Sequence, residues 1–146
     1  MNLSALLFGF GGRINRGKWW LAVLIYVIFW IIVGIIAFAV MTAAPMAGIA
    51  VLLVAGIVAI VSGIAVGVKR LHDRDKSGWW LLAFYLVPAL LNGVGAASGS
   101  EAVAMLTSLI AFAVSVWMIV ELGCLRGTAG PNQYGPDPLE PAAAYA

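Results

Sequence analysis

The chain has 146 residues, of which 64% are hydrophobic and only 10% are charged, against about 25% charged residues in an ordinary soluble domain. This composition excludes a soluble globular protein and a disordered chain, and the net charge of +2 excludes a nucleic-acid-binding protein, which needs a concentrated basic surface. A single cysteine, Cys124, allows no internal disulfide and no zinc site even together with His72, so we expect no metal and no cofactor. The composition is that of a membrane protein.

Four charge-free apolar runs are long enough to cross the roughly 30 Å hydrocarbon core of a bilayer as helices. They cover residues 19–41, 46–68, 79–97 and 102–120. The sequence therefore predicts an all-α, polytopic membrane protein with four transmembrane helices arranged as two helical hairpins. Pro88 removes a backbone hydrogen bond in the middle of the third run, so we expect this helix to be kinked near Leu86 or to end early near Leu91.

The positions of lysine and arginine predict the orientation. All eight lie before the first run, between the second and third runs, or after the fourth run, whereas the opposite side carries only the charge of Glu101. By the positive-inside rule, both termini face the cytoplasm. Tryptophans lie at the cytoplasmic ends of two spans, where indole rings prefer to lie, and they favour the same orientation; they are Trp19, Trp20, Trp79 and Trp80.

These boundaries divide the chain into three parts. Residues 1–18 form a cytoplasmic interfacial segment, in which Leu3, Leu6, Leu7 and Phe10 recur at the spacing of a short helix. Residues 19–122 form the four-helix membrane domain. Residues 123–146 form a cytoplasmic tail, whose many glycines and prolines favour turns or disorder over regular structure.

Small residues recur at every fourth position of the second run, at Ala55, Ala59, Gly63 and Gly67. Such a strip lies on one helix face and lets another helix approach closely, so it predicts a helix-packing face, with a pore-lining face as the alternative. Leucine in place of Gly63 should then force the helices apart.

Residues 69–78 hold the densest charges of the chain and its only histidine, His72. The simplest interpretation is a solvated loop at headgroup depth that fixes the topology and pairs its own charges, with lipid or partner binding as the alternative. Adjacent helical side chains point apart, so His72 and Asp73 do not form an evident acid–base pair. We therefore predict no enzymatic activity, although a membrane enzyme using His72, Asp73 and Asp137 stays an alternative.

The apolar runs contain no Asp, Glu, Lys, Arg or His, which argues against an ion-coupled transporter. Two classes of function remain. The first is a structural, interaction or lipid-associated protein. The second is an oligomeric small channel or exporter component, whose pore would be lined by Ser62, Asn92, Thr107, Ser108 and Ser115.

Three blocks of the sequence resemble a known bacterial family. They are Phe10-x-Gly12-Arg13-x-x-Arg16-x-x-x-Trp20, Arg70-Leu71-His72-Asp73-x-x-x-Ser77-Gly78-Trp79-Trp80, and Gly127-Thr128-x-Gly130-x-Asn132-x-Tyr134-Gly135-x-Asp137-Pro138. In this order they resemble the inner-membrane family called domain of unknown function 805. The resemblance implies a small multi-helix protein of the bacterial inner membrane with no established enzymatic activity, and it supplies no catalytic residue. The chain departs from the family at Lys69, where an arginine is frequent, and at Asp75, where glycine or another small residue is frequent.

Two hairpins would return all three blocks to the cytoplasmic surface, and we predict that they form a charged collar there. The collar residues are Arg13, Arg16, Arg70, His72, Asp73, Asn132, Tyr134 and Asp137. In the collar, Asp73 or Asp137 would accept hydrogen bonds from an arginine of another block, while surplus cations face anionic lipid headgroups. Membrane lipids are therefore the expected partners, with a second copy of the chain or another membrane protein as alternatives. Three independent solvated segments are the alternative to a collar.

Overall fold

The computed structural model describes residues 2–140. Its helices, in chain order, are α1 (Leu3–Phe8), α2 (Arg16–Ala43), α3 (Pro45–Asp73), α4 (Trp80–Ala97), α5 (Glu101–Ile119) and the short π-helix η1 (Val120–Cys124). Within these residues the β-structure consists of one isolated bridge between Asn132 and Gly135. The all-α class predicted from the sequence is confirmed.

Four helical segments are long and apolar enough to cross a membrane: α2, α3, α4, and α5 continued by η1. They confirm the four predicted spans. One boundary differs in a way that matters, because α3 continues to Asp73. The first five residues of the charged segment 69–78 are therefore helical, and the prediction of a loop throughout this segment is wrong.

Helix α4 runs through Pro88 and ends only at Ala97, so the early end near Leu91 is wrong, while the kink stays a prediction. The turn before α4 needs a residue with positive φ, which Asp75 adopts at 55°. Aspartate tolerates this left-handed conformation better than most non-glycine residues. The turn therefore forms with Asp75, at a position where the family resemblance favours glycine or another small residue.

Two asparagines start helices at the N-terminal side of the molecule. The Asn2 side chain accepts the amide N–H of Ala5 at the start of α1, and the Asn15 side chain accepts that of Lys18 at the start of α2. The short N-terminal helix predicted from the sequence is confirmed as α1, with Phe10 lying beyond its end, whereas its interfacial location stays a prediction.

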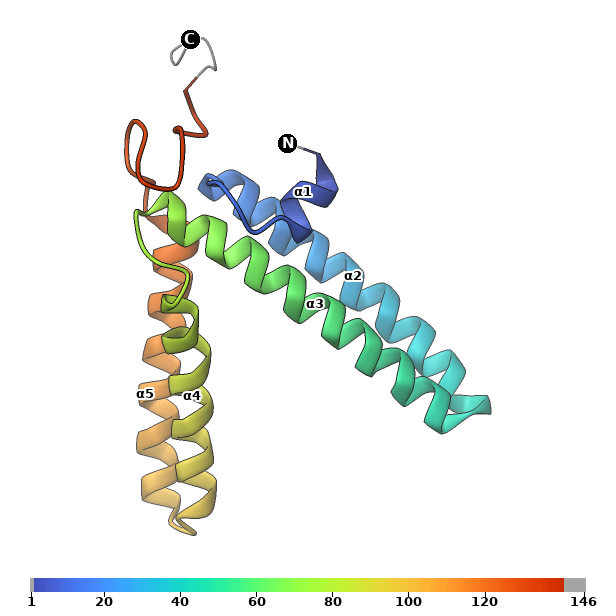
Figure 1. The fold of residues 1–146 in the computed structure, drawn as a ribbon. Helices are drawn as coiled ribbons and strands as arrows, with labels where there is room; N and C mark the ends of the chain where they lie inside the picture. Colours follow the sequence, from blue (N-terminus) through green and yellow to red (C-terminus); the bar gives the residue numbers. More distant parts are fainter. Residues whose placement is uncertain (1, 141–146) are drawn as a thin grey trace.

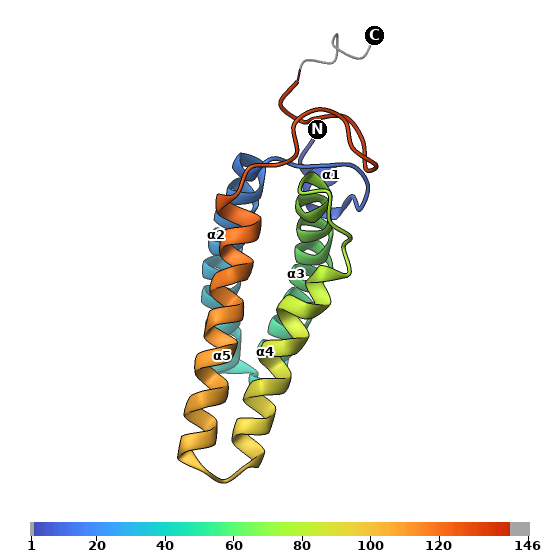
Figure 2. The ribbon, with the colours of Figure 1, turned by 90° about the vertical axis from the view of Figure 1, so that its left-hand side faces the viewer.

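Helices α2 and α3 lie side by side, and so do α4 and α5 (Figure 1). The two pairs meet at one end and diverge away from it, as Figure 1 shows. The N-terminal segment, the connection between α3 and α4, and the described part of the tail all lie at this shared end (Figures 1 and 2). We call it the charged end.

Buried apolar side chains gather near the charged end in two clusters. One contains Leu6, Ile14, Ala22 and Val66, beneath α1. The other contains Leu71, Leu81, Phe84 and Leu122, where the two helix pairs meet. Farther from the charged end the helices expose large apolar side chains, as a lipid-facing surface requires. The relative placement of the helix pairs is therefore fixed mainly at the charged end.

Candidate functional site

Asp73, at the last turn of α3, lies at the centre of the collar and is 2% exposed. Its Oδ1 accepts a hydrogen bond from Arg13 Nε at 3.2 Å, and its Oδ2 accepts one from Arg70, three residues earlier on the same helix. Its backbone carbonyl accepts the amide N–H of Thr128 at 2.8 Å. One aspartate thus contacts the N-terminal segment, its own helix and the tail.

The Arg13 guanidinium connects the N-terminal segment to the tail. Besides Asp73, it donates to the carbonyls of Thr128 at 2.6 Å, Gly130 at 2.8 Å and Gly135 at 3.2 Å. Arginine presents five N–H donors in a rigid planar fork, so it can contact a carboxylate and several carbonyls at once. This geometry explains why an arginine, rather than a lysine, suits this position.

Side chains of α2 and α3 donate hydrogen bonds to the consecutive backbone carbonyls of residues 122–125, where the second helix pair ends. Arg70 Nε donates to Leu122 O at 2.6 Å and another Arg70 nitrogen donates to Leu125 O. Between these, Trp20 Nε1 donates to Gly123 O at 3.0 Å, and Arg16 donates to Cys124 O at 3.2 Å. The last carbonyls of a helix have no partner within the helix and carry its negative dipole end, so cationic donors suit them.

Glu121 of η1 forms a second buried ion cluster and is 3% exposed. It accepts from Arg74 at 3.0 Å and from Lys76 at 2.9 Å. Both cations lie in the connection between α3 and α4, so the cluster links that connection to the end of the fourth span.

The tail covers the end of α3 through His72. The His72 ring stacks on Tyr134, with ring centroids 3.8 Å apart and planes 4° apart. The Asn132 side-chain amide donates to His72 O at 2.9 Å, and His72 Nδ1 lies 3.3 Å from Gly12 O. His72 is therefore held by packing and backbone contacts, in an arrangement that differs from a catalytic His–Asp pair.

Asp137 shapes the tail itself. Its carboxylate accepts the backbone N–H groups of Gly130 at 3.2 Å and Leu139 at 2.9 Å. Of the two aspartates expected to accept an arginine of another block, Asp73 accepts one from Arg13. The structure brings together all eight predicted collar residues at the charged end. Among them, Asp137 accepts hydrogen bonds within the tail, and Arg16 donates to Cys124 O at the end of η1.

Lys69 was expected to be solvated and is instead 1% exposed. Its Nζ donates to the carbonyls of Ala5 and Leu6, each at 2.6 Å, at the C-terminal end of α1. With Arg13, Arg70, Asp73 and Glu121 it makes five buried charged side chains in the described chain. The solvated-loop interpretation of residues 69–78 is therefore wrong for the helical part of this segment.

Burying charge is costly unless each charge finds partners. Within residues 2–140, every buried side-chain nitrogen and oxygen has a hydrogen-bond partner. The three buried cations exceed the two buried anions, and helix-end carbonyls supply the remaining negative potential. Among the same residues no cluster of three His, Cys, Asp or Glu side chains could hold a metal ion. The collar is thus arranged to hold chain segments together.

A comparison with protein families bears on this architecture. Residues 7–136 match the family model described as "Protein of unknown function (DUF805)". The chain belongs to the DUF805 family. The match includes nearly all of the three sequence blocks that the structure brings together at the charged end.

Relatives of this DUF805 protein occur in Escherichia coli K12. The chain is 32% identical to "Inner membrane protein YhaH" over 137 residues, covering 91% of this chain and 90% of that protein. It is 30% identical to "Inner membrane protein YhaI" over 130 residues, covering 89% and 86%. It is also 29% identical to "Uncharacterized protein YiiR", covering 94% and 90%. No solved structure matches the chain significantly.

The strip of small residues behaves differently along its length in this DUF805 protein. Ala55 and Gly67 are buried, and a side chain at Gly67 would meet Leu81 of α4. Ala59 and Gly63 instead line a cavity between α3 and α4, and nothing lies within 4 Å of a Cβ placed on Gly63. The predicted packing face therefore exists at Gly67, but the prediction that Gly63 is a close helix contact is wrong.

Several hydroxyl groups considered as pore-lining residues bond within the protomer. The Ser62 hydroxyl donates to Leu7 O at 2.9 Å and lies 2.8 Å from the Tyr26 hydroxyl. These two hydrogen bonds attach α1 to the first helix pair. Thr107 and Ser115 donate to carbonyls one turn earlier on α5. These contacts give the three hydroxyls structural roles, and they do not favour the channel alternative.

Sequence reasoning missed Lys69, Glu121, Gly127 and Thr128 as parts of the site. Gly127 and Thr128 open the third family-like block, and this was the available signal for them. A Cβ on Gly127 would overlap the Asp73 carboxylate, so glycine is needed for the tail to approach. The roles of Lys69 and Glu121 depend on contacts more than 40 residues away in sequence, for which their local sequence gives no signal.

Proposed function

We propose that this protein is a non-enzymatic integral protein of the bacterial inner membrane, whose cytoplasmic collar joins its two helix pairs and presents cations to anionic phospholipids. The observation that carries the proposal is the buried Asp73, which contacts Arg13, Arg70 and the tail together. The negative charge of Asp73 stabilises the contact of α3 with the N-terminal segment. A collar of this kind would give a small membrane protein one rigid end at the membrane surface.

The cations that remain available support the lipid-associated part of the proposal. In the part of the chain between residues 2 and 140, Arg16, Lys18 and Arg126 make no ion pair. All three lie at the charged end, which holds every Lys and Arg and five of the six Asp and Glu, a net charge of +3. Each such cation near an anionic membrane surface contributes about 1 kcal/mol of attraction.

The test of lipid association uses the full chain in nanodiscs of phosphatidylglycerol or of phosphatidylcholine with the same acyl chains. We expect phosphatidylglycerol to raise the melting temperature, and added salt to reduce the effect. The triple variant Arg16→Gln, Lys18→Gln, Arg126→Gln should lose the effect. The charge-preserving control Arg16→Lys, Lys18→Arg, Arg126→Lys should keep it. Equal melting in both lipids, or an effect that survives in the glutamine variant, would contradict the proposal.

Orientation is tested separately through Cys124, the single cysteine, which is exposed at the charged end. The positive-inside rule supports a cytoplasmic charged end. An impermeant maleimide should therefore label Cys124 in inside-out vesicles and leave it unlabelled in intact spheroplasts. The control Ser98→Cys in a Cys124→Ser background lies on the opposite connection and should show the reverse. If Cys124 were labelled in spheroplasts, the orientation would be inverted.

A further inference from the structure

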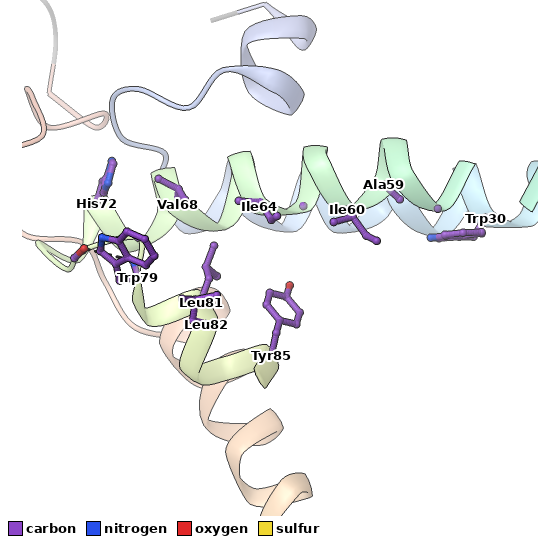
Figure 3. A pocket seen from close by; sticks show the side chains of 14 residues that line it. Trp30, Ala59, Ile60, Ile64, Val68, His72, Trp79, Leu81, Leu82 and Tyr85 are labelled. Carbon is purple, nitrogen blue, oxygen red and sulfur yellow. Dashed lines mark hydrogen bonds between the residues drawn. The ribbon is translucent and has the colours of Figure 1, made fainter. Parts of the chain in front are cut away.

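A cavity of about 980 Å³ lies between the diverging helices α3 and α4 and extends to Trp30 of α2. We call it the wedge. Figure 3 shows Ile60 and Ile64 of α3 on one side and Leu81 and Tyr85 of α4 on the other. His72 and Trp79 lie at its charged end (Figure 3). Along the membrane-spanning helices the lining of the wedge is mostly apolar, and its polar groups there are the Tyr85 hydroxyl and the Trp30 indole; near the collar it is lined by His72 and Ser77.

The narrow end of the wedge limits the kind of molecule that can bind there. Near the charged end α3 and α4 come so close that a Cβ on Gly67 would lie 2.8 Å from Leu81 Cδ2. The wedge nevertheless continues beside this contact to Ser77 and Gly78. A helix with side chains is about 10–12 Å wide and cannot enter there, whereas a single hydrocarbon chain can. This geometry favours a lipid over a second copy of the chain.

The wedge is longer than the hydrocarbon part of one bilayer leaflet. From His72 to Gly56, both of which line it, α3 spans sixteen residues, or about 24 Å at 1.5 Å per residue. Half of the hydrocarbon core is about 15 Å thick. An acyl chain that begins at the charged end can therefore extend within the wedge for its full depth in that leaflet.

Tyr85 places a hydroxyl group in the wedge within the first two turns of α4 from the charged end. Tyr85 is on the second turn of α4, and its hydroxyl points toward α3 in Figure 3. This hydroxyl has no hydrogen-bond partner within residues 2–140. A hydroxyl surrounded by hydrocarbon gains free energy from any acceptor it can reach. The ester carbonyl of a phospholipid would be such an acceptor.

We propose that the wedge binds one acyl chain of an anionic phospholipid from the leaflet at the charged end. The headgroup lies over Ser77 and Trp79, beside the net charge of +3 of the charged end, and an ester carbonyl accepts the Tyr85 hydroxyl. The inference deepens the proposed function and rests on it, because it assigns the lipid association a specific site within the protomer.

The test uses phosphatidylglycerol with a photoactivatable diazirine on one acyl chain, incorporated with the full chain into nanodiscs. Mass spectrometry then maps the labelled residues. We expect labelling to concentrate on Ile60, Ile64 and Trp30, and to be weaker with a phosphatidylcholine probe of identical chains. Gly63→Leu places a side chain in the wedge, where nothing lies within 4 Å of its Cβ, and should lose this labelling. Gly34→Leu is the matched control, because Gly34 is an exposed helical glycine outside the wedge with nothing within 4 Å of its Cβ.

Several results would overturn the wedge site. They are even labelling over all lipid-facing helices, undiminished labelling in Gly63→Leu, equal labelling by both headgroups, or crosslinked dimers in place of lipid adducts. Thermal unfolding of Gly63→Leu, Gly34→Leu and the parent is measured in parallel, and cooperative transitions at similar temperatures show that both variants fold. If phosphatidylglycerol still raises the melting temperature through the exposed cations, failure of the labelling test refutes the wedge alone. If that effect is also absent, the proposed function fails as well.

Discussion

Arg13 Nε lies 3.2 Å from Asp73 Oδ1, although the two residues are 60 positions apart in the sequence and both side chains are almost fully buried. The same guanidinium binds three tail carbonyls, while the backbone carbonyl of Asp73 binds Thr128. Removing one partner of a buried ion pair leaves an uncompensated charge, which is strongly destabilising. This pair is therefore the contact on which the assembly of the collar depends most.

We predict that Gly127→Ala destabilises the protein. The new methyl group would overlap the Asp73 carboxylate, which cannot move away because Arg13 and Arg70 hold it. Overpacking of this kind costs about 1–3 kcal/mol. Thermal unfolding in detergent should show a lower melting temperature. Gly11→Ala is the control, since Gly11 is exposed and nothing lies within 4 Å of its Cβ. Equal melting of the two variants would mean that the tail does not pack on Asp73.

We predict that Lys69→Met loosens α1 selectively. The ammonium group of Lys69 binds the last carbonyls of α1, and methionine offers no donor to them. Hydrogen exchange should become faster in residues 3–8 while exchange in the tail stays unchanged. Lys18→Met serves as the control, because Lys18 makes no ion pair in the described chain. If hydrogen exchange in α1 were the same in Lys69→Met and the parent, α1 would be held to the helices by Ser62 and apolar packing without a contribution from Lys69.

We predict that Gly67→Leu destabilises the contact between the helix pairs and that Gly63→Leu does not. The side chain at position 67 meets Leu81, which is 5% exposed, whereas the side chain at position 63 extends into the wedge. The expected loss for Gly67→Leu is about 1–3 kcal/mol. Melting curves of both variants in detergent test this. A larger loss for Gly63→Leu would restore the packing role that the sequence pattern predicted.

The helices could be predicted from the sequence because their signals are local. Four apolar runs, a short amphipathic segment before them and a Gly- and Pro-rich tail depend on composition and spacing within each segment. The collar was predictable in part, because three charged blocks fall on the same side of the four spans. That placement predicted that Asp73 or Asp137 would accept an arginine of another block, and the structure shows that Asp73 accepts Arg13.

Other features carry no local signal. The carbonyls of Leu122, Gly123 and Cys124 accept donors from α2 and α3, and backbone carbonyls are the same at every residue. The burial of Lys69 depends on where α1 packs, which its own neighbours in sequence do not encode. The prediction for the small-residue strip is wrong at Gly63 for a related reason. Going away from the charged end, α4 diverges from α3 beyond Gly67, so no side chain of α4 lies against Gly63. How far two helices stay in contact is decided by their side chains jointly.

A double-mutant cycle on Arg13→Gln and Asp73→Asn tests the central claim most directly. The free energy of unfolding is measured for the parent, both single variants and the double variant by titration with SDS from mixed micelles. We expect each single variant to lose about 3 kcal/mol, because it leaves a buried charge without its partner. The double variant should lose less than the sum of the single losses, with a coupling energy of about 1–3 kcal/mol. Additive losses within about 0.5 kcal/mol would contradict the account, because they would show that Arg13 and Asp73 do not hold the collar together through their contact.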